Sequence, residues 1–578
     1  MAQEGSEYDL VIRGGTVYDG TGSPGVLADV AVKDGRVVAI ESSISGSARR
    51  EVDAKGCWVS PGFFDLHAHY DAEIEVKPGL HESVRHGVTH VIMGNCSLSI
   101  ALGSEEELLN LFCRVESMPR EVVERWLGGR ISWKNVTEYY EHLDTIPMGP
   151  NVGSFLGHSN VRIAAMGYRR SMTVEKATAE ELQTMRDTVQ EAMDAGYLGL
   201  SIDMLPWHRI ERGEFLGEPV PSQHAHISEH RALANIARKA GRVLQATPNG
   251  LDKKSVLQLM FMSAGLIRKA LRVTVVSAMD VVGNRLIWLM AILGASVINT
   301  LFRAQYRWQC LTTPFLNFAD GANTPIFEEF ATGVEAINAE EEDRKKLFAD
   351  AGFRKRFRAD WYRRGPKLYH HMWDKMTVVK SPESEQIGKN FKELAQGTGS
   401  DPVEVFMDLM AKHGSLLRWK TVVGNDRDGP RHKLLKNPGI IPGFNDSGAH
   451  NQQMAFQDGT LQLLKQVLLN PHVMTIENAI HRQTGEVAEY LGVDAGTICV
   501  GDHADLVVID PEKLKTGLSD PIEHYDDDFG GSMRLVRRSD GVVKFVAVGG
   551  KTVMDENGFS ETYGKERFGR LLRAQRKG

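Results

Sequence analysis

PGFFDLHAHYD, at residues 61–71, is the most informative stretch of this 578-residue chain. Within it Asp65, His67 and His69 alternate, and alternate side chains of a strand point to the same face. Two imidazoles two residues apart on one face can bind a single metal ion. We therefore interpret this stretch as the end of a strand that carries a metal site.

Seven further apolar runs follow this one, and helical patterns separate them. Continuous apolar runs are typical of parallel strands, which are buried on both faces. The clearest helical pattern covers 177–196, with acidic residues at its start and Gly196 at its end. Alternating strands and helices of this number predict an α/β fold, a (β/α)8 TIM-type barrel. The expected strands are 59–66, 88–93, 152–156, 198–202, 243–247, 273–277, 419–423 and 439–444.

The gap between the sixth and seventh of these strands is too long for one crossover. We therefore expect an insertion at about 300–400, between strands 6 and 7. Its segment 339–365 is rich in charged and aromatic residues, which is compatible with a nucleic-acid patch or with a pair of amphipathic helices. Acidic residues in the first half offset basic residues in the second, which favours the helices. Their expected buried stripe is Leu347, Phe353, Phe357 and Trp361.

Both ends of the chain have β-type patterns. Asp34-Gly35 lies between two apolar runs, which is a strong indication of a hairpin. Neither end has enough strands for a stable sheet alone, so we expect the two ends to form one composite β-sandwich; two separate hairpins are the alternative. The expected domains are an N-terminal sandwich segment at 1–57, the barrel with its insertion at 58–490, and a C-terminal sandwich segment with its tail at 491–578.

Composition places the chain among ordinary globular proteins. It has 42% hydrophobic and 25% charged residues and a net charge of −7, so no overall basic field favours nucleic acid or an anionic membrane. Its five cysteines include no CxxC pair, and no apolar run opens the sequence, so we expect a cytoplasmic protein. We expect a homo-oligomer with neither a nucleic-acid nor a membrane partner.

The longest apolar stretch, Leu286–Ile298, has 13 residues. It is too short to cross a bilayer, and we expect it to be a buried helix. The wider segment 255–299 could instead be an exposed amphipathic helix at a membrane, but a barrel helix or an oligomer face is the favoured interpretation.

Two further stretches follow expected strands and carry candidate ligands. Cys96 lies in GVTHVIMGNCSLSIA (87–101), where it is either a small buried residue or a thiolate ligand suited to zinc. The polar turn around it favours the ligand. Asp446 lies in GIIPGFNDSGAH (439–450), where it can bind metal, accept a proton from water, or cap a turn.

These motifs resemble the amidohydrolase superfamily, and within it the longer branch of the N-acyl-D-amino-acid deacylases, or D-aminoacylases. The resemblance implies that His67, His69, Cys96 and Asp446 match the metal-site residues of that group. It also implies that Cys96 takes the bridging place filled by a carboxylated lysine in many relatives. The matching stretches include IRGGTVYDGTG at 12–22, PGFFDLHAH at 61–69, GVTHVIMGNCSLS at 87–99, FLGHSNVR at 155–162, GYLGLSIDM at 196–204, FNDSGAH at 444–450 and GDHADLVVID at 501–510.

The sequence departs from that group at three places. The group's histidines at the ends of strands 5 and 6 are replaced around Thr247 and Ser277, and its tyrosine after strand 4 has no match near Asp203 and Trp207. Four candidate ligands remain, enough for one ion. We therefore expect one zinc, or another divalent transition metal, on His67, His69 and Cys96, with Asp446 as fourth ligand or as base.

The resemblance implies a metal-dependent amidohydrolase that cleaves the C–N amide bond of a small N-acyl compound, chiefly an N-acyl (D-)amino acid, with Asp446 as the catalytic base. One alternative is a hydrolase or lyase acting on another amide, a cyclic imide or a carbonyl compound. A second is a non-catalytic scaffold, which the four retained candidate ligands oppose. The remaining candidates for supporting or substrate-binding roles are Asp65, His158, Arg162, Asp203, Trp207, Arg418 and His450.

Overall fold

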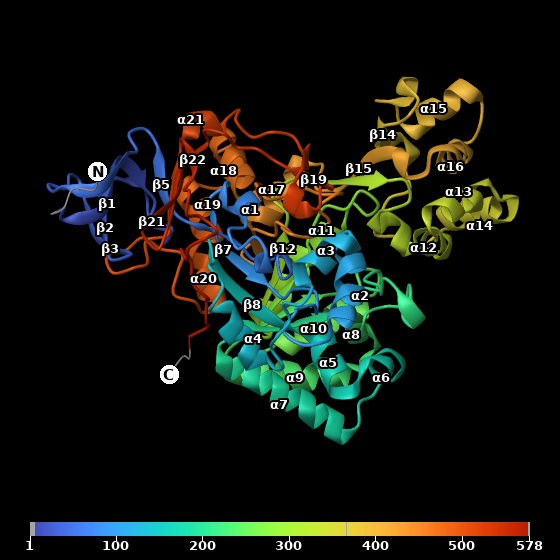
Figure 1. Ribbon diagram of the computed structural model, residues 1–578, viewed down its shortest axis with the longest axis horizontal. Helices are drawn as coiled ribbons and strands as arrows, with labels where there is room; N and C mark the ends of the chain where they lie inside the picture. The colour runs from blue at the N-terminus through green and yellow to red at the C-terminus, as the bar shows by residue number, and fades with distance from the viewer. Residues whose placement is uncertain (1–5, 366, 576–578) are drawn as a thin grey trace.

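The computed structural model describes residues 6–365 and 367–575. Figure 1 shows a central body of strands and helices, a sheet at the left that contains the N-terminal strands, and a lobe at the upper right that carries α12 to α16. The metal-site candidates belong to the central body, so its sheet is described first.

Eight parallel strands form the central sheet, in the order β16-β12-β11-β10-β9-β8-β7-β6. The sheet is curled, and its two edges meet beyond the strand ends: the amide of Leu66 donates to the Gly443 carbonyl at 3.2 Å, and that of His69 to the Ser447 carbonyl at 2.7 Å. The expected α/β fold with eight parallel strands is confirmed. The strands are β6 Phe63–Asp65, β7 Val88–Met93, β8 Asn151–Gly157, β9 Gly199–Asp203, β10 Val243–Thr247, β11 Arg272–Val275, β12 Gln305–Cys310 and β16 Ile440–Pro442.

Helices pack around this sheet and build the other parts of the molecule. The helix expected over 177–196 is α7, which begins after the Thr178 cap and ends at Gly196 in the left-handed region (φ 103°). The helices are α1 His81–Val84, α2 Glu105–Val115, α3 Arg120–Leu127, α4 Val136–Leu143, α5 His158–Met166, α6 Tyr168–Thr173, α7 Ala179–Ala195, α8 Pro221–His224, α9 Ile227–Ala240, α10 Lys253–Ser263, α11 Ile287–Leu301, α12 Ala331–Asn338, α13 Glu341–Ala349, α14 Ala351–Trp361, α15 Phe391–Thr398, α16 Pro402–His413, α17 Asp428–Lys436, α18 Gly459–Leu469, α19 Ile476–Gln483, α20 Gly485–Leu491 and α21 Pro511–Leu514.

The expected seventh strand and the place of the insertion were wrong. The seventh strand of the central sheet is β12, whereas 419–423 lies in β15 (Arg418–Gly424), which pairs antiparallel with β13 (Phe315–Asp320) and β14 (Met376–Lys380). The insertion therefore lies between β12 and β16, the seventh and eighth strands. The error has a physical origin. The sequence of β12, QYRWQC, contains no apolar run, and the apolar run in β15 does not indicate which strands it pairs with.

The insertion has a core of its own. Helices α13 and α14 are the expected helix pair, and Phe353, Phe357 and Trp361 are fully buried as expected. Phe348 is buried beside them, whereas Leu347 is only half-buried. The basic side chains of α14 pair with acidic residues at the start of α16, so this segment presents an ion-paired helix surface.

The two chain ends contribute strands to one nine-stranded sheet, because β5 (Trp58–Pro61) pairs antiparallel with β17 (Leu506–Ile509). The expected hairpin at Asp34-Gly35 connects β2 and β3 (φ 51° and 74°). A two-layer sandwich and the domain bounds stay predictions. The other strands are β1 Tyr8–Val17, β2 Val26–Lys33, β3 Arg36–Glu41, β4 Ala48–Asp53, β20 Val543–Val548, β21 Lys551–Asp555 and β22 Gly558–Phe559, while β18 Ile522–Tyr525 and β19 Met533–Val536 form a separate pair.

The expectation of a buried helix at 286–298 was also wrong. Helix α11 covers most of this stretch, but it buries only Ala291, Ala295 and Ile298. Its opposite side is open, with Leu286 68% and Leu293 55% exposed. A run of apolar residues does not reveal that one side of its helix has no neighbour. Among the described residues, no helix is both long and apolar enough to cross a membrane.

Candidate metal centre

Four side chains meet beyond the carboxyl ends of β6, β7 and β16. Nε2 of His67 lies 3.3 Å from Sγ of Cys96 and 3.8 Å from Oδ1 of Asp446, and Nε2 of His69 lies 3.4 Å from the same Oδ1. Within this group His67, His69 and Cys96 each offer a ligand atom, all within 4.8 Å of one another. The four residues expected at the site are therefore neighbours in the structure.

Tight turns aim these side chains. Cys96 and Asp446 have φ values of 52° and 53°, in the left-handed region that is costly for residues with a side chain. The Asn95 amide group donates to the carbonyls of Ala68 and Ile92 at 3.2 and 2.9 Å, which ties the Cys96 turn to the strand end that carries the two histidines. Backbone conformations of this kind persist only where the surroundings enforce them.

Asp65 lies behind the histidines. Its Oδ1 accepts the amide proton of His67 at 3.2 Å, so the carboxyl group contacts the backbone rather than an imidazole. Burial raises the pKa of Asp65 to about 7. This carboxyl group holds the position of the strand end and thereby of His67.

The ends of β10 and β11 contribute hydroxyl and amide groups. The Thr247 hydroxyl donates to Sγ of Cys96 at 3.3 Å, and the amide of Cys96 donates to Oε1 of Gln245 at 2.9 Å. Ser277, at the expected position after β11, lines the cavity that opens onto these side chains. The two positions at which the resemblance implies histidines therefore carry hydroxyl groups, and the hydroxyl of Thr247 contacts Cys96.

Two residues at the site had not been expected, Glu116 and His208. Oε1 of Glu116 lies 3.2 Å from Nδ1 of His69, and burial raises the pKa of Glu116 to about 7. Nδ1 of His208 lies 2.6 Å from Oδ2 of Asp203. Burial lowers the pKa of His208, but the Asp203 carboxylate outweighs this effect and leaves the pKa above its usual value. Asp203 is thus a support for His208.

No motif marks Glu116, which follows α2 without a distinctive neighbour, whereas His208 directly follows Trp207 in the stretch after strand 4. The only indication in the sequence was for His208, which directly follows the expected site residue Trp207. Both side chains reach the site through loops, so spacing along a strand could not place them.

A cavity of about 1260 Å³ opens onto the group. Trp207 lines it and packs against Tyr369 of the insertion, with ring centroids 5.6 Å apart. His450 also lines it; burial lowers the pKa of His450, and its Nδ1 lies 3.3 Å from Oε1 of Gln453. The insertion and helices α10 and α11 supply other walls of the cavity, through Pro325, Leu368, Leu257, Ile287 and Met290.

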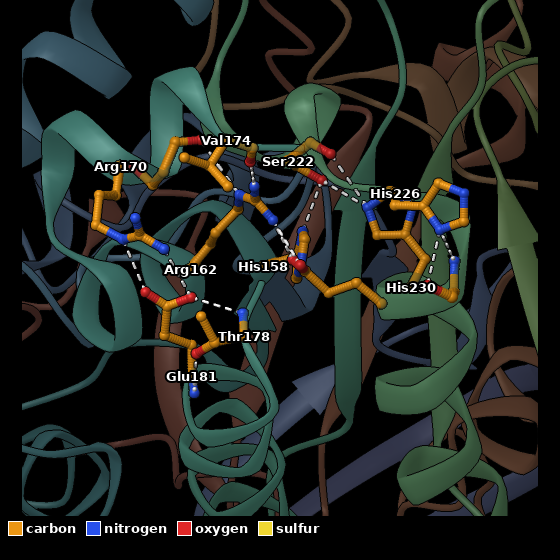
Figure 2. A network of polar contacts seen from close by, with 12 residues as sticks. His158, Arg162, Arg170, Val174, Thr178, Glu181, Ser222, His226 and His230 are labelled. Atoms are coloured by element: carbon orange, nitrogen blue, oxygen red, sulfur yellow. Dashed lines mark hydrogen bonds and ion pairs between the residues drawn. The ribbon is translucent and has the colours of Figure 1, made fainter. Parts of the chain in front are cut away.

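Five expected residues do not line this cavity: Asp65 and Asp203, which contact residues of the site, and His158, Arg162 and Arg418. Nε2 of His158 lies 3.0 Å from Glu229, and the Arg162 guanidinium lies 2.6 Å from both oxygens of the same carboxylate (Figure 2). Arg418, in the insertion, binds Asp320 with two contacts of 2.6 Å. Each of these three side chains contacts a carboxylate of the protein itself, so their contacts contribute to the scaffold.

Glu229 is expected to be a major stabilising group, because its loss would leave the buried Arg162 guanidinium without its only carboxylate partner among the described residues. Burial raises the pKa of Glu229, but its bonds to His158 and Arg162 outweigh this effect and hold the pKa at about 2. Glu229→Gln should lower the free energy of unfolding at pH 7 by about 3 kcal/mol, measured by urea denaturation. Because the folded pKa lies below the usual 4.5, the stabilisation exists above about pH 4.5 and is lost as the pH falls toward 2.

The matched control is Glu181→Gln, which removes the charge that pairs with Arg170 on the surface of the same region (Figure 2) and keeps an amide able to complete the cap at Thr178. This variant should unfold at nearly the wild-type urea concentration. Equal losses in the two variants would contradict the role given to Glu229.

Comparison with known proteins connects this geometry to a family. A family model for the amidohydrolase family matches residues 50–240. An uncharacterized protein of Mycobacterium tuberculosis is 37% identical over 99% of this chain and 97% of its own length. D-aminoacylase of Alcaligenes xylosoxydans xylosoxydans is 32% identical over 35% of this chain and 39% of that enzyme. N-acyl-D-glutamate deacylase from Bordetella bronchiseptica, in complex with zinc and a phosphonate inhibitor that mimics the tetrahedral intermediate, has the same fold, with a TM-score of 0.62 and 22% identity over 98% of this chain and all of that one.

Proposed function

Because this chain belongs to the amidohydrolase superfamily as a D-aminoacylase-like hydrolase of non-peptide C–N bonds, we propose that it removes the acyl group from an N-acyl amino acid. The observation that carries the proposal is the convergence of His67, His69 and Cys96 with Asp446 at the base of the cavity. The named relatives of known activity are deacylases of N-acyl-D-amino acids, which favours the D configuration.

The three donors fit a single zinc ion or another divalent transition metal. Two imidazoles and one sulfur form a set that zinc prefers, and catalytic zinc sites use three protein ligands. Burial raises the pKa of the Cys96 thiol to about 12, so its thiolate, the form that binds metal, requires a cation beside it. The Nδ1 atom of His67 is buried and has no hydrogen-bond partner among the described residues. We propose one ion per chain.

When bound, such an ion lowers the pKa of a water molecule and polarises the carbonyl group to be attacked. Asp446 supplies the proton transfers. Burial raises the pKa of Asp446, but the hydrogen bond from His69 and the charge of that imidazole outweigh this effect and hold it at about 2. The carboxylate is therefore ionised at neutral pH, accepts a proton from the attacking water and returns it to the amide nitrogen as the C–N bond breaks.

The carboxylate of an N-acyl amino acid also needs a cation. Arg162, Arg418 and Arg427 all pair with protein carboxylates and do not line the cavity. Of the cations that do line it, Arg212, Lys253 and Lys367 have no ion pair with a carboxylate in the described part of the chain, but Lys367 donates to the Trp361 carbonyl and contacts His371. We therefore propose Arg212 and Lys253 as partners of the substrate carboxylate. The non-catalytic scaffold alternative is set aside, because the family is one of hydrolases.

A substrate panel tests the proposal. The purified protein should hydrolyse at least one N-acyl-D-amino acid faster than its L enantiomer, should lose this activity after chelation, and should regain it with one equivalent of zinc. Amine release measured on paired D and L substrates, aryl amides and cyclic imides provides the readout. Hydrolysis of cyclic imides alone would favour the other reaction class, and activity that survives complete metal removal would contradict the proposal.

A further inference from the structure

Helices α10 and α11 present an apolar face that no described residue covers. The two helices are neighbours, since the rings of Phe261 and Phe302 lie 5.3 Å apart and the amide of Gly265 donates to the Phe302 carbonyl at 2.9 Å. Helix α11 contains no charged residue over its 15 positions. The apolar face consists of the exposed side chains Leu257, Phe261, Leu266, Ile267, Leu286, Leu289, Met290, Leu293, Val297 and Leu301.

The spacing of these residues makes a continuous surface. From Leu286, the residue before α11, through Leu293 to Leu301, exposed apolar positions recur every three or four residues, which is one side of a helix. Between the two helices Ile267 projects from a loop and is 98% exposed. Large contiguous exposed apolar patches are rare on monomeric soluble proteins and mark surfaces that bind a partner, a ligand or a membrane.

Cations surround the apolar face. Residues 253–303 contain seven basic residues and one acidic residue, Asp280, which is buried and pairs with Arg285 and Arg427. In the described part of the chain none of the exposed basic residues of this segment pairs with a carboxylate: Lys253, Lys254, Arg268, Lys269 and Arg303. The net charge of −7 of the whole chain conceals this local excess of positive charge.

The apolar face is also continuous with the catalytic cavity. Leu257 and Met290 are exposed members of the face and line the cavity, and Ile287 and Gly294 of α11 line it as well. An apolar chain lying against α10 and α11 would therefore have an apolar path toward the metal-binding side chains. Contact between subunits alone would not require the apolar face to be continuous with the cavity.

We propose that α10 and α11 dock the protein on an anionic lipid bilayer, which presents N-acyl amphiphiles to the cavity. The apolar face would enter the headgroup region while the surrounding cations contact lipid phosphates, as in amphipathic helices that lie in the membrane plane. Helix α11, at 15 residues, is about 22 Å long and too short to span the bilayer. A second copy is the weaker occupant, because a symmetric contact would bring the two sets of unpaired cations together. The docking of the surface on a bilayer does not depend on the reaction. Only the statement that the lipid phase presents N-acyl substrates rests on the proposed function.

Co-sedimentation with vesicles tests the docking without any assay of activity. The full-length protein should sediment with vesicles that contain phosphatidylglycerol, should bind far less to pure phosphatidylcholine, and should be released by high salt. Ile267→Asp and Leu293→Asp should each weaken binding by about tenfold or more, since each removes a large apolar side chain from the buried contact. The triple variant R268Q/K269Q/R303Q should bind anionic vesicles as weakly as neutral ones.

Leu469→Asp is the matched control, because Leu469 is 59% exposed and belongs to α18, a helix that is not part of the apolar face. It should bind vesicles like the wild type. Ile267→Asp and Leu293→Asp should keep wild-type turnover of a short, water-soluble N-acyl substrate, which separates a docking defect from a catalytic one. The proposal would be overturned if the wild-type protein did not sediment with anionic vesicles. It would also be overturned if light scattering showed a dimer that dissociates only in Ile267→Asp and Leu293→Asp.

Discussion

Cys96→Ala should reduce the metal content from about one ion per chain to less than about a tenth of an ion, and should lower kcat/KM at least about 100-fold. Residues that merely support a metal ligand change affinity or activity by about 10- to 100-fold, so loss of a ligand should cost at least as much. In this chain Cys96 contributes the only sulfur of the group and lies 3.3 Å from Nε2 of His67. Its removal leaves two imidazoles, and Asp446 would have to become the third ligand and could then no longer act as the base.

The measurement is elemental mass spectrometry on protein purified without added metal, together with kcat/KM for the best substrate. Cys113→Ala is the matched control: Cys113 is another buried cysteine that lines the cavity, but it belongs to α2 and, among the described residues, to no group of metal-ligating side chains. This variant should keep its metal. Two ions in the wild type would show that further ligands take part, and a wild type that binds no metal even after reconstitution would contradict the site.

Asp446→Asn should lower kcat by about 10²- to 10⁴-fold, the range for loss of a general base. The amide side chain keeps the shape of the carboxylate but cannot accept the proton of the attacking water. If Asp446 acts as the base alone, the metal content should stay near one ion per chain. If it is also the fourth ligand, metal and activity should fall together.

Asp426→Asn is the control for this experiment. Asp426 pairs with Arg285, does not line the cavity, and carries a carboxylate whose loss should leave kcat near the wild-type value. Steady-state kinetics and metal analysis on the same preparations separate the two roles of Asp446. Full activity in Asp446→Asn would contradict both of them.

The sequence alone predicted that four candidate ligands lie close together. His67, His69, Cys96 and Asp446 each lie within three residues of the end of an expected strand, and in a parallel sheet the carboxyl ends of all strands lie on one side. The expected strand positions and this geometric rule therefore predicted that the four side chains lie close together. The Asp34-Gly35 hairpin and helix α7 were predictable for a similar reason, because local turn and cap chemistry specifies them.

Interactions between segments far apart in the chain decided the rest. Glu116 and His208 reach the site on loops, where side-chain positions depend on packing. The seventh strand was misplaced for two reasons. The sequence of β12 does not indicate that it pairs with the parallel strands, and β15 is apolar although it belongs to another sheet. Helix α11 has the composition of a buried helix. Which of its side chains are exposed depends on the elements packed against it, and among the described residues one side of α11 has no neighbour. Local patterns thus determined the elements and the ends of strands, whereas burial and contacts over long sequence distances depend on the whole chain and were decided by the tertiary structure.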